Sequence, residues 1–301
     1  MKQTIFFSLP ENEKLTQLLA NKSNAEIGNA IIRRFPDGES YLRILTDVKN
    51  KYVVLVCTLH EPDSKLLPLY FLSNTAKSLG AKNVCLVAPY LSYMRQDKVF
   101  NPGEGVTSTY FGKLISEFAD GIITIDPHLH RIKSLSKVYH IPNTVIHTAH
   151  MISKWIKENV KNPVLIGPDS ESAQWVLEVA KNAGAPFIVL NKIRHSDSDV
   201  EVSILDVENY KNATPVLVDD IISTAHTMIA TIKHLKKEGM KPPVCIGIHA
   251  VFSGNAYQEL MDCEVDKVVT CNTIPHPSNA IDISDILAKG IQELILKLHS
   301  K

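Results

Sequence analysis

The chain has 301 residues, of which 45% are hydrophobic and 21% charged, and this length suits two globular domains of ordinary size. Its 32 basic residues balance 32 acidic ones, so no overall positive field is available to attract nucleic acid or an anionic membrane. We therefore expect neither kind of partner, and we expect any bound anion to be held by a local site.

Cysteine usage and the amino-terminal residues bear on the cellular compartment. The five cysteines are scattered and form no CxxC pair, which argues against a disulfide framework or a zinc site and favours a reducing cytoplasm. The apolar run from Ile5 to Leu9 ends at Pro10, which is too early for a signal peptide, and no later run reaches membrane-spanning length. These features predict a cytoplasmic protein.

Apolar segments of strand length alternate with amphipathic helical segments from the first residues onward. In the first half, the pattern predicts helices at Lys65–Leu79 and Thr109–Phe118, and strands at Thr4–Ser8, Ile31–Phe35, Tyr41–Leu45, Val53–Cys57, Val84–Ala88 and Ile122–Ile125. The Asp37-Gly38 dipeptide between the second and third of these strands predicts a β-hairpin.

The second half continues the alternation. It predicts helices at Ala173–Asn182, Met228–Glu238 and Ile283–His299, and strands at Val164–Ile166, Phe187–Leu190, Val202–Leu205, Val216–Val218, Val244–Ala250 and Lys267–Cys271. Alternating strands and helices are typical of an α/β fold, in which mostly parallel sheets are covered by helices on both faces.

A weak internal repeat indicates two related halves. Val53–Val56 leads through a loop and a helix to Gly80 and a further strand, and Val216–Val218 leads likewise to Gly239 and a strand. Two related α/β domains, residues 1–145 and 146–301, account for this pattern. Chance likeness between two βαβ units accounts for it equally well.

The strongest chemical signal follows the predicted strand Val216–Val218. Asp219 and Asp220 come next, and then a hydroxyl-rich turn opens a helix, with Ser223, Thr224, Ala225, His226 and Thr227. Open α/β sheets bind ligands at the carboxyl ends of their strands, and the start of a helix favours a phosphate group. Carboxylates just before the turn suit sugar hydroxyls or hydrated Mg²⁺. Alternatively, the acids only end a strand and Ser223 only caps a helix.

This segment resembles the phosphoribosyl diphosphate binding loop that phosphoribosyltransferases and ribose-phosphate pyrophosphokinases share. It departs from that loop at Ala225-His226, where the family usually has glycines that permit positive φ. The resemblance implies two related phosphoribosyltransferase-like domains, each with a mostly parallel sheet flanked by helices, and a β-hairpin near residues 31–45.

Further motifs resemble the ribose-phosphate pyrophosphokinases in particular, in family order from the first strand to about Thr273. The resemblance implies that ATP is bound by Phe35, Asp37, Gly38, Glu39, Arg95, Gln96 and Asp97. It implies that ribose 5-phosphate is bound by Asp169, Asp219, Asp220, Ser223, Thr224, Ala225, His226 and Thr227. It assigns metal binding to His128 and Asp169, and catalysis to Lys192, Arg194 and His128.

The resemblance implies an activity as well. ATP and ribose 5-phosphate would be the substrates, Mg²⁺ the cofactor, and AMP and phosphoribosyl diphosphate the products, in a homo-oligomer. The segment Lys98–Val106 lacks the arginine of the common phosphate-activated class and is similar to the archaeal type with Pro-Gly-Glu. We therefore expect weak or absent activation by phosphate.

Two other functions stay open. A phosphoribosyltransferase would use the same loop, but it needs no ATP-binding hairpin and no second related half. A non-catalytic regulatory homologue is favoured by Ala225-His226 and opposed by Lys192, Arg194 and His128. Single motifs also have simpler interpretations: Asp37-Gly38 as a turn only, Arg95 with Asp97 as a solvated ion pair, and Lys192 with Arg194 as surface cations.

Overall fold

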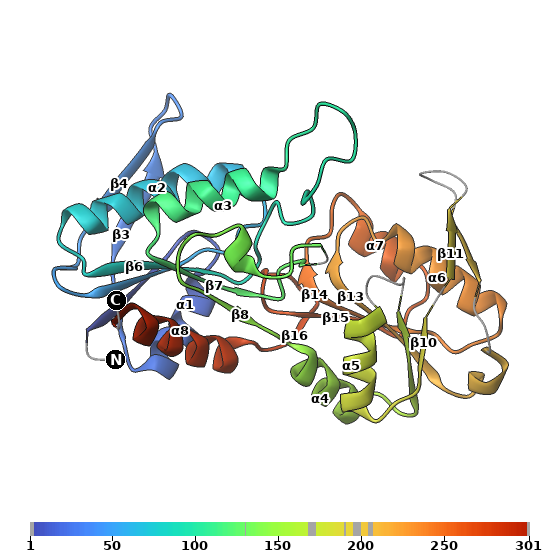
Figure 1. The fold of residues 1–301 in the computed structure, drawn as a ribbon. Helices are drawn as coiled ribbons and strands as arrows, with labels where there is room; N and C mark the ends of the chain where they lie inside the picture. Colours follow the sequence, from blue (N-terminus) through green and yellow to red (C-terminus); the bar gives the residue numbers. More distant parts are fainter. Residues whose placement is uncertain are drawn as a thin grey trace. The chain divides into compact units, whose positions relative to one another are not determined.

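The computed structural model describes residues 3–129, 131–167, 173–189, 191–194, 200–203 and 207–299. The chain forms two compact units, Met1–Ile146 with Ile283–Lys301, and His147–Asp282. Each unit is an α/β layer structure, as the sequence predicts (Figure 1).

The first unit is built on a six-stranded parallel sheet in the order β2-β1-β5-β6-β7-β8. Its strands are β1 (Thr4–Ser8), β2 (Glu26–Ile27), β5 (Tyr52–Val56), β6 (Asn83–Ala88), β7 (Gly121–Ile125) and β8 (Asn143–Ile146). Helices cover both faces, α2 (Asp63–Ser78) and α3 (Thr107–Phe118) on one, α1 (Glu13–Ser23) and α8 (Ser284–His299) on the other (Figure 1). Covering on both faces explains why β5 and β7 are buried at every position.

Helix α8 packs in the first unit although it ends the chain. A Cβ atom at Gly290 would lie 2.6 Å from Ile123 Cδ1 and 2.7 Å from Ile146 Cδ1, so glycine permits a close approach of the helix to the sheet. The sequence grouped these residues with the second half. The packing places them with the first unit, because helical period predicts a helix but not the sheet that it covers.

A separate hairpin projects from the first unit. Strands β3 (Ala30–Arg34) and β4 (Ser40–Ile44) pair with each other only, among the described strands, with Arg34 opposite Ser40. The apolar residues of one hairpin face pack against the core of this unit: Ala30, Ile32, Leu42 and Ile44. The hairpin predicted from Asp37-Gly38 is therefore present.

The second unit repeats this topology. Its parallel sheet has the order β10-β9-β13-β14-β15-β16, formed by β9 (Pro163–Gly167), β10 (Phe187–Val189), β13 (Thr214–Ile222), β14 (Val244–Ala250), β15 (Lys267–Cys271) and β16 (Asn279–Ile281). Helices α4 (Ala149–Asn159) and α5 (Ala173–Ala183) lie on one face, and α6 (His226–Lys237) and α7 (Ala256–Met261) on the other (Figure 1).

Both sheets place their first strand between the second and the third, and both insert a two-stranded ribbon before the third strand, β3–β4 and β11 (Asn191–Arg194) with β12 (Val200–Ser203). The internal repeat thus corresponds to two copies of one topology. In such sheets the crevice lies where the strand order reverses, between the carboxyl ends of the first and third strands. These are β1 and β5 in one unit and β9 and β13 in the other.

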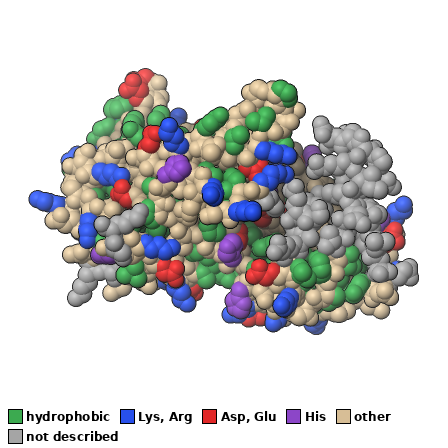
Figure 2. Space-filling view, viewed as in Figure 1, with side chains coloured by type: hydrophobic (Ala, Val, Ile, Leu, Met, Phe, Trp, Pro, Cys, Tyr) green, Lys and Arg blue, Asp and Glu red, His purple; other side chains and the backbone are tan. Residues whose placement is uncertain are grey.

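The surface fits the balanced charge of the chain. Figure 2 shows basic and acidic side chains spread over the visible face, without one sign covering it. Among the described residues, no helix combines the length and the apolar character needed to cross a membrane.

Candidate active site

The two acids of the loop motif lie inside a strand. β13 continues through Asp219 and Asp220 to Ile222, with Asp219 opposite Gly247 of β14. The prediction that the strand ends at Val218 was wrong, because β14 is long enough to pair with three further residues, Asp219, Ile221 and Ile222. Successive side chains leave opposite faces of a strand, so the two half-buried carboxylates do not start from one face. The Asp220 N–H donates a 2.9 Å hydrogen bond to Asp219 Oδ1.

The turn after β13 keeps a glycine-like backbone without glycine. Ala225 has φ 56° and ψ 3°, in the left-handed region, and it is buried at the start of α6. This conformation costs a non-glycine residue about 1–2 kcal/mol. Within the described part of the chain, no side chain caps the first turn of α6, so its N–H groups suit an anion. His226 and Thr224 are exposed, and Ser223 and Thr227 are half-buried.

A second loop supports this turn. Ser253, which follows β14, lies with its Oγ 3.0 Å from Ser223 Oγ, and its N–H donates to the Ser223 carbonyl at 3.1 Å. The Phe252 N–H donates to the Ile222 carbonyl at 2.9 Å. Sequence reasoning missed Ser253, because its only local signal is a polar turn after a buried strand.

Three expected site residues fall at the limits of the described structure. Asp169 lies outside the described residues, and the side chains of Lys192 and Arg194 are likewise not described. The backbone of the last two belongs to β11, where Lys192 pairs with Val202 and Arg194 with Val200 of β12.

In the first unit, the segment after β6 is held by Tyr93. Its phenol donates a short hydrogen bond to Asp63 at the start of α2, which raises the pKa of Tyr93 to about 12. Tyr93 has φ 62°, and its carbonyl accepts the Gln96 N–H at 3.3 Å. Thr107 donates to Gln96 Oε1 at 2.8 Å. Arg95 is exposed at this fixed turn.

Asp97 differs from its expected setting. Its side chain is fully buried, and its Oδ1 lies 3.2 Å from Nη1 of Arg131. A solvated pair of Arg95 with Asp97 is therefore wrong as an interpretation. Arg131 was not singled out from the sequence, because the pairing joins segments 34 residues apart.

His128 lies just beyond β7. The strand ends at Ile125, Asp126 adopts φ 32°, and His128 is half-buried. Among the described residues, no cluster of three or more His, Cys, Asp or Glu side chains could hold a metal ion. Mg²⁺ is commonly held by one or two carboxylates together with substrate phosphates. The carboxylates of Asp219 and Asp220 provide oxygen donors of that kind.

The tip of the hairpin is an ordered turn. The Gly38 N–H donates to the Phe35 carbonyl at 2.9 Å, the Phe35 N–H donates to the Glu39 carbonyl at 2.8 Å, and Gly38 has φ 94°. The Asp37 carboxylate accepts the Glu39 N–H at 3.1 Å, so Asp37 stabilises the turn. Phe35 is 39% exposed, and the Arg33 guanidinium lies 4.7 Å from its ring centroid. The hairpin thus presents an aromatic ring beside a cation.

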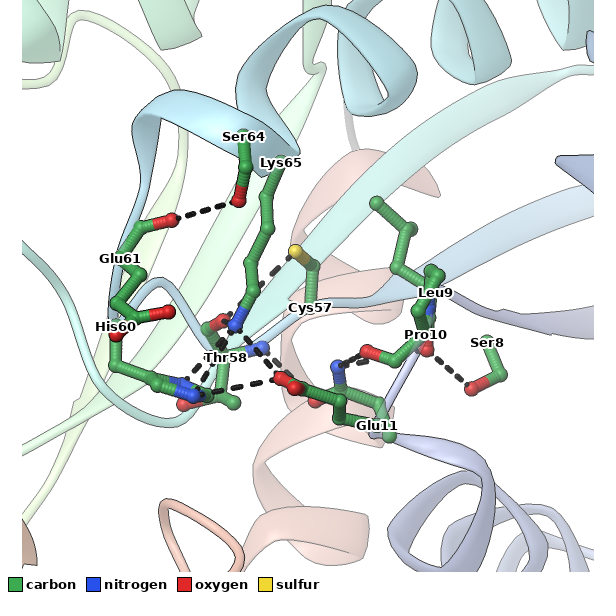
Figure 3. A network of polar contacts seen from close by, with 11 residues as sticks. Ser8, Leu9, Pro10, Glu11, Cys57, Thr58, His60, Glu61, Ser64 and Lys65 are labelled. Carbon is green, nitrogen blue, oxygen red and sulfur yellow. Dashed lines mark hydrogen bonds and ion pairs between the residues drawn. The ribbon is translucent and has the colours of Figure 1, made fainter. Parts of the chain in front are cut away.

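Beyond the carboxyl ends of β1 and β5 in the first unit, charged side chains form a network of polar contacts (Figure 3). The ammonium of Lys65 lies 3.1 Å from Glu11 Oε2, 3.1 Å from His60 Nδ1 and 3.4 Å from the Thr58 carbonyl. Burial, and next the nearby Lys65, lower the pKa of His60. Glu11 follows β1 and His60 follows β5, so this network corresponds in topology to the Asp219–Thr227 edge of the second unit.

Family comparisons agree with this architecture. The family profile of the N-terminal domain of ribose phosphate pyrophosphokinase matches residues 4–118, and that of the phosphoribosyl transferase domain matches residues 134–285. The chain belongs to the ribose-phosphate pyrophosphokinase family. A ribose-phosphate pyrophosphokinase from Methanopyrus kandleri is 30% identical, over 96% of this chain and 99% of its own length. One from Methanobrevibacter smithii is 28% identical, over 94% and 98% respectively.

The fold also matches a solved structure. Phosphoribosylpyrophosphate synthetase from Mycobacterium smegmatis aligns with a TM-score of 0.85 over 98% of this chain and 99% of its own, at 22% identity. The two related phosphoribosyltransferase-like domains expected from the sequence are therefore confirmed.

Proposed function

We propose that this ribose-phosphate pyrophosphokinase transfers the diphosphate of ATP to the anomeric hydroxyl of ribose 5-phosphate. The hydroxyl oxygen forms the new bond to the β-phosphorus and loses its proton. The bond from that phosphorus to the α,β-bridging oxygen breaks, and AMP leaves. The observation that carries the proposal is the second-unit edge, where two carboxylates precede an uncapped helix start behind a left-handed Ala225.

That edge suits ribose 5-phosphate. Carboxylates accept hydrogen bonds from sugar hydroxyls, so we assign Asp219 and Asp220 to the ribose. The N–H groups at the start of α6 and the hydroxyls of Ser223, Thr224 and Thr227 suit the 5-phosphate. Asp169 completes this set in the proposal.

The first unit supplies the ATP residues in the proposal. The exposed ring of Phe35 suits stacking on adenine, while Asp37, Gly38 and Glu39 form the turn that presents it. Arg95 and Gln96 lie on the turn fixed by Tyr93. Lys192 and Arg194 would close over the diphosphate, where cations neutralise charge that develops during phosphoryl transfer.

We assign Mg²⁺ to His128 and Asp169, with phosphate oxygens of the substrates as further ligands. When bound, Mg²⁺ neutralises charge on those oxygens. We further propose a homo-oligomer, which light scattering after size-exclusion chromatography tests.

Incubation of the purified protein with MgATP and ribose 5-phosphate tests the reaction. We expect AMP and phosphoribosyl diphosphate in equal amounts, and label in the β-phosphate of ATP should enter the sugar product. ADP in place of AMP would contradict diphosphate transfer. Activity only with phosphoribosyl diphosphate and a base would indicate a phosphoribosyltransferase. No turnover unless an active homologue is added would indicate a regulatory subunit.

A further inference from the structure

Asp97 is a buried carboxylate with one described partner. Its side chain is 0% exposed, Oδ1 lies 3.2 Å from Arg131 Nη1, and Oδ2 has no hydrogen-bond partner among the described residues. A buried carboxylate is costly unless an opposite charge compensates it. The Arg131 guanidinium provides that charge. Because Asp97 is buried, it can act on a ligand only through Arg131.

Arg131 connects the buried carboxylate to the surface. Its side chain is 36% exposed, and its guanidinium carbon lies 5.7 Å from the centroid of the half-exposed Phe100 ring. Arginine stays charged at every accessible pH, and its planar group can bind two phosphate oxygens at once. The anchor restrains the side chain before any ligand binds, so little rotamer freedom remains to be lost on binding.

The location of this pair fits an anionic ligand. Asp97 follows β6 and Arg131 follows β7, so both lie beyond the carboxyl ends of neighbouring strands, where α/β sheets bind ligands. The carboxylate of Glu104, in the adjoining loop, is already hydrogen-bonded within that loop. Glu104 accepts the N–H groups of Phe100 and Asn101 at 2.8 and 3.0 Å and the Asn101 amide at 2.7 Å, which lowers its pKa.

We propose that Arg131 binds the polyphosphate chain of ATP and that Asp97 is the positioning residue that holds its guanidinium. This inference rests on the proposed function for the identity of the nucleotide. It replaces the direct contact between Asp97 and ATP that the sequence resemblance implies.

Nucleotide affinities measured by calorimetry, at constant Mg²⁺, test the proposal. Arg131→Lys keeps the charge but loses the planar fork, and we expect it to weaken ATP binding about tenfold while changing AMP affinity less than threefold. Arg131→Gln alone leaves an uncompensated buried carboxylate. The double variant D97N/R131Q removes both charges, so it should fold and show the same selective loss. Lys133→Gln, an exposed cation two residues away, is the matched control and should bind ATP as the parent does.

Equal affinity of parent and Arg131→Lys for ATP would overturn the inference, as would equal losses for ATP and AMP. Thermal unfolding of each variant shows whether a loss of ATP affinity comes from unfolding of the protein. Where it does, the ATP and AMP affinities of D97N/R131Q decide whether Arg131 binds ATP. The proposed function and the role of Arg131 are tested by different measurements. AMP formation by the parent decides the proposed function, whereas the ratio of ATP to AMP affinities decides the role of Arg131 even without turnover.

Discussion

Lys65 and Glu11 form an ion pair at 3.1 Å in the first unit, at the place that Asp219 and the phosphate-type turn occupy in the second. The Lys65 side chain is only 11% exposed, and its ammonium also contacts the Thr58 carbonyl and the His60 ring. One topology therefore has two outcomes. The second unit has two carboxylates and a turn suited to a phosphorylated sugar, whereas the first unit neutralises its own cation with Glu11.

Removal of the Glu11 charge should destabilise the protein without affecting ribose 5-phosphate binding. Glu11→Gln leaves the nearly buried Lys65 ammonium without its carboxylate, and we expect a loss of about 1–2 kcal/mol, discounted because Glu11 is half-exposed. Lys65→Met removes the charge and keeps the length, so its loss should be smaller. Urea unfolding measures both. An equal loss in the two variants would contradict the ion-pair explanation.

Mild acid should weaken the first unit through His60. Its pKa in the folded protein is lowered, first by burial and next by Lys65, while Glu11 and Glu61 oppose the shift. The unfolded chain therefore binds more protons just below the ordinary histidine pKa of about 6.5, and stability falls as the pH decreases through that window. His60→Gln should make the free energy of unfolding less dependent on pH between about 6.5 and 5. The same slope in variant and parent would assign the acid sensitivity to other groups, such as His276, whose pKa burial also lowers.

Substitution by glycine should change the free energy of unfolding in opposite directions at Ala225 and Ala230. Ala225 is left-handed, so Ala225→Gly relieves strain and should leave stability equal to or above that of the parent. Ala230 lies inside α6, where the same change should cost about 1 kcal/mol. Ala225→Val should lose more than either. Chemical unfolding tests the series, and equal losses at the two positions would show that Ala225 is not left-handed in solution.

Much of the fold follows from local pattern. Strands β1, β14 and β15 have the predicted bounds, because a continuous apolar run between polar turns marks a strand that is buried on both faces. The short strands β2 and β16, with two and three residues, were missed because they offer too few positions for a period to show. Helix α4 was not predicted, and it begins just after the domain boundary that the sequence placed between residues 145 and 146.

The candidate site, like the fold, could be predicted only in part from the sequence. Residue types and the order of motifs were visible in the sequence, and the left-handed turn could be suspected where glycine is usual. The partners Ser253 and Arg131 could not be predicted, since they lie 30 and 34 residues from the groups that they hold. Such pairs are set by which strands become neighbours, and local periodicity does not encode that order.

The two loop acids should not be equivalent. Asp219 and Asp220 leave opposite faces of β13, so one carboxylate can meet the ribose more directly than the other. We expect Asp219→Asn and Asp220→Asn to raise the KM for ribose 5-phosphate by factors that differ at least fivefold. Both variants should leave the KM for ATP within about twofold of the parent value, since neither acid is proposed to contact ATP. Equal effects would mean that the strand end twists enough to bring both acids to one side.

Ser253 should act on ribose 5-phosphate through Ser223. The hydroxyls lie 3.0 Å apart, and one neutral hydrogen bond contributes about 1 kcal/mol, so Ser253→Ala should weaken ribose 5-phosphate about fivefold. Ser223→Ala should weaken it at least as much, because this hydroxyl is proposed to meet the phosphate. In the double variant the losses should not add, since Ser253 has no further route to the ligand once Ser223 is gone. Calorimetric titration of the parent and the three variants completes the cycle. Additive losses would assign Ser253 its own contact with the substrate, and no loss in Ser253→Ala would leave its backbone N–H as the group that fixes the turn.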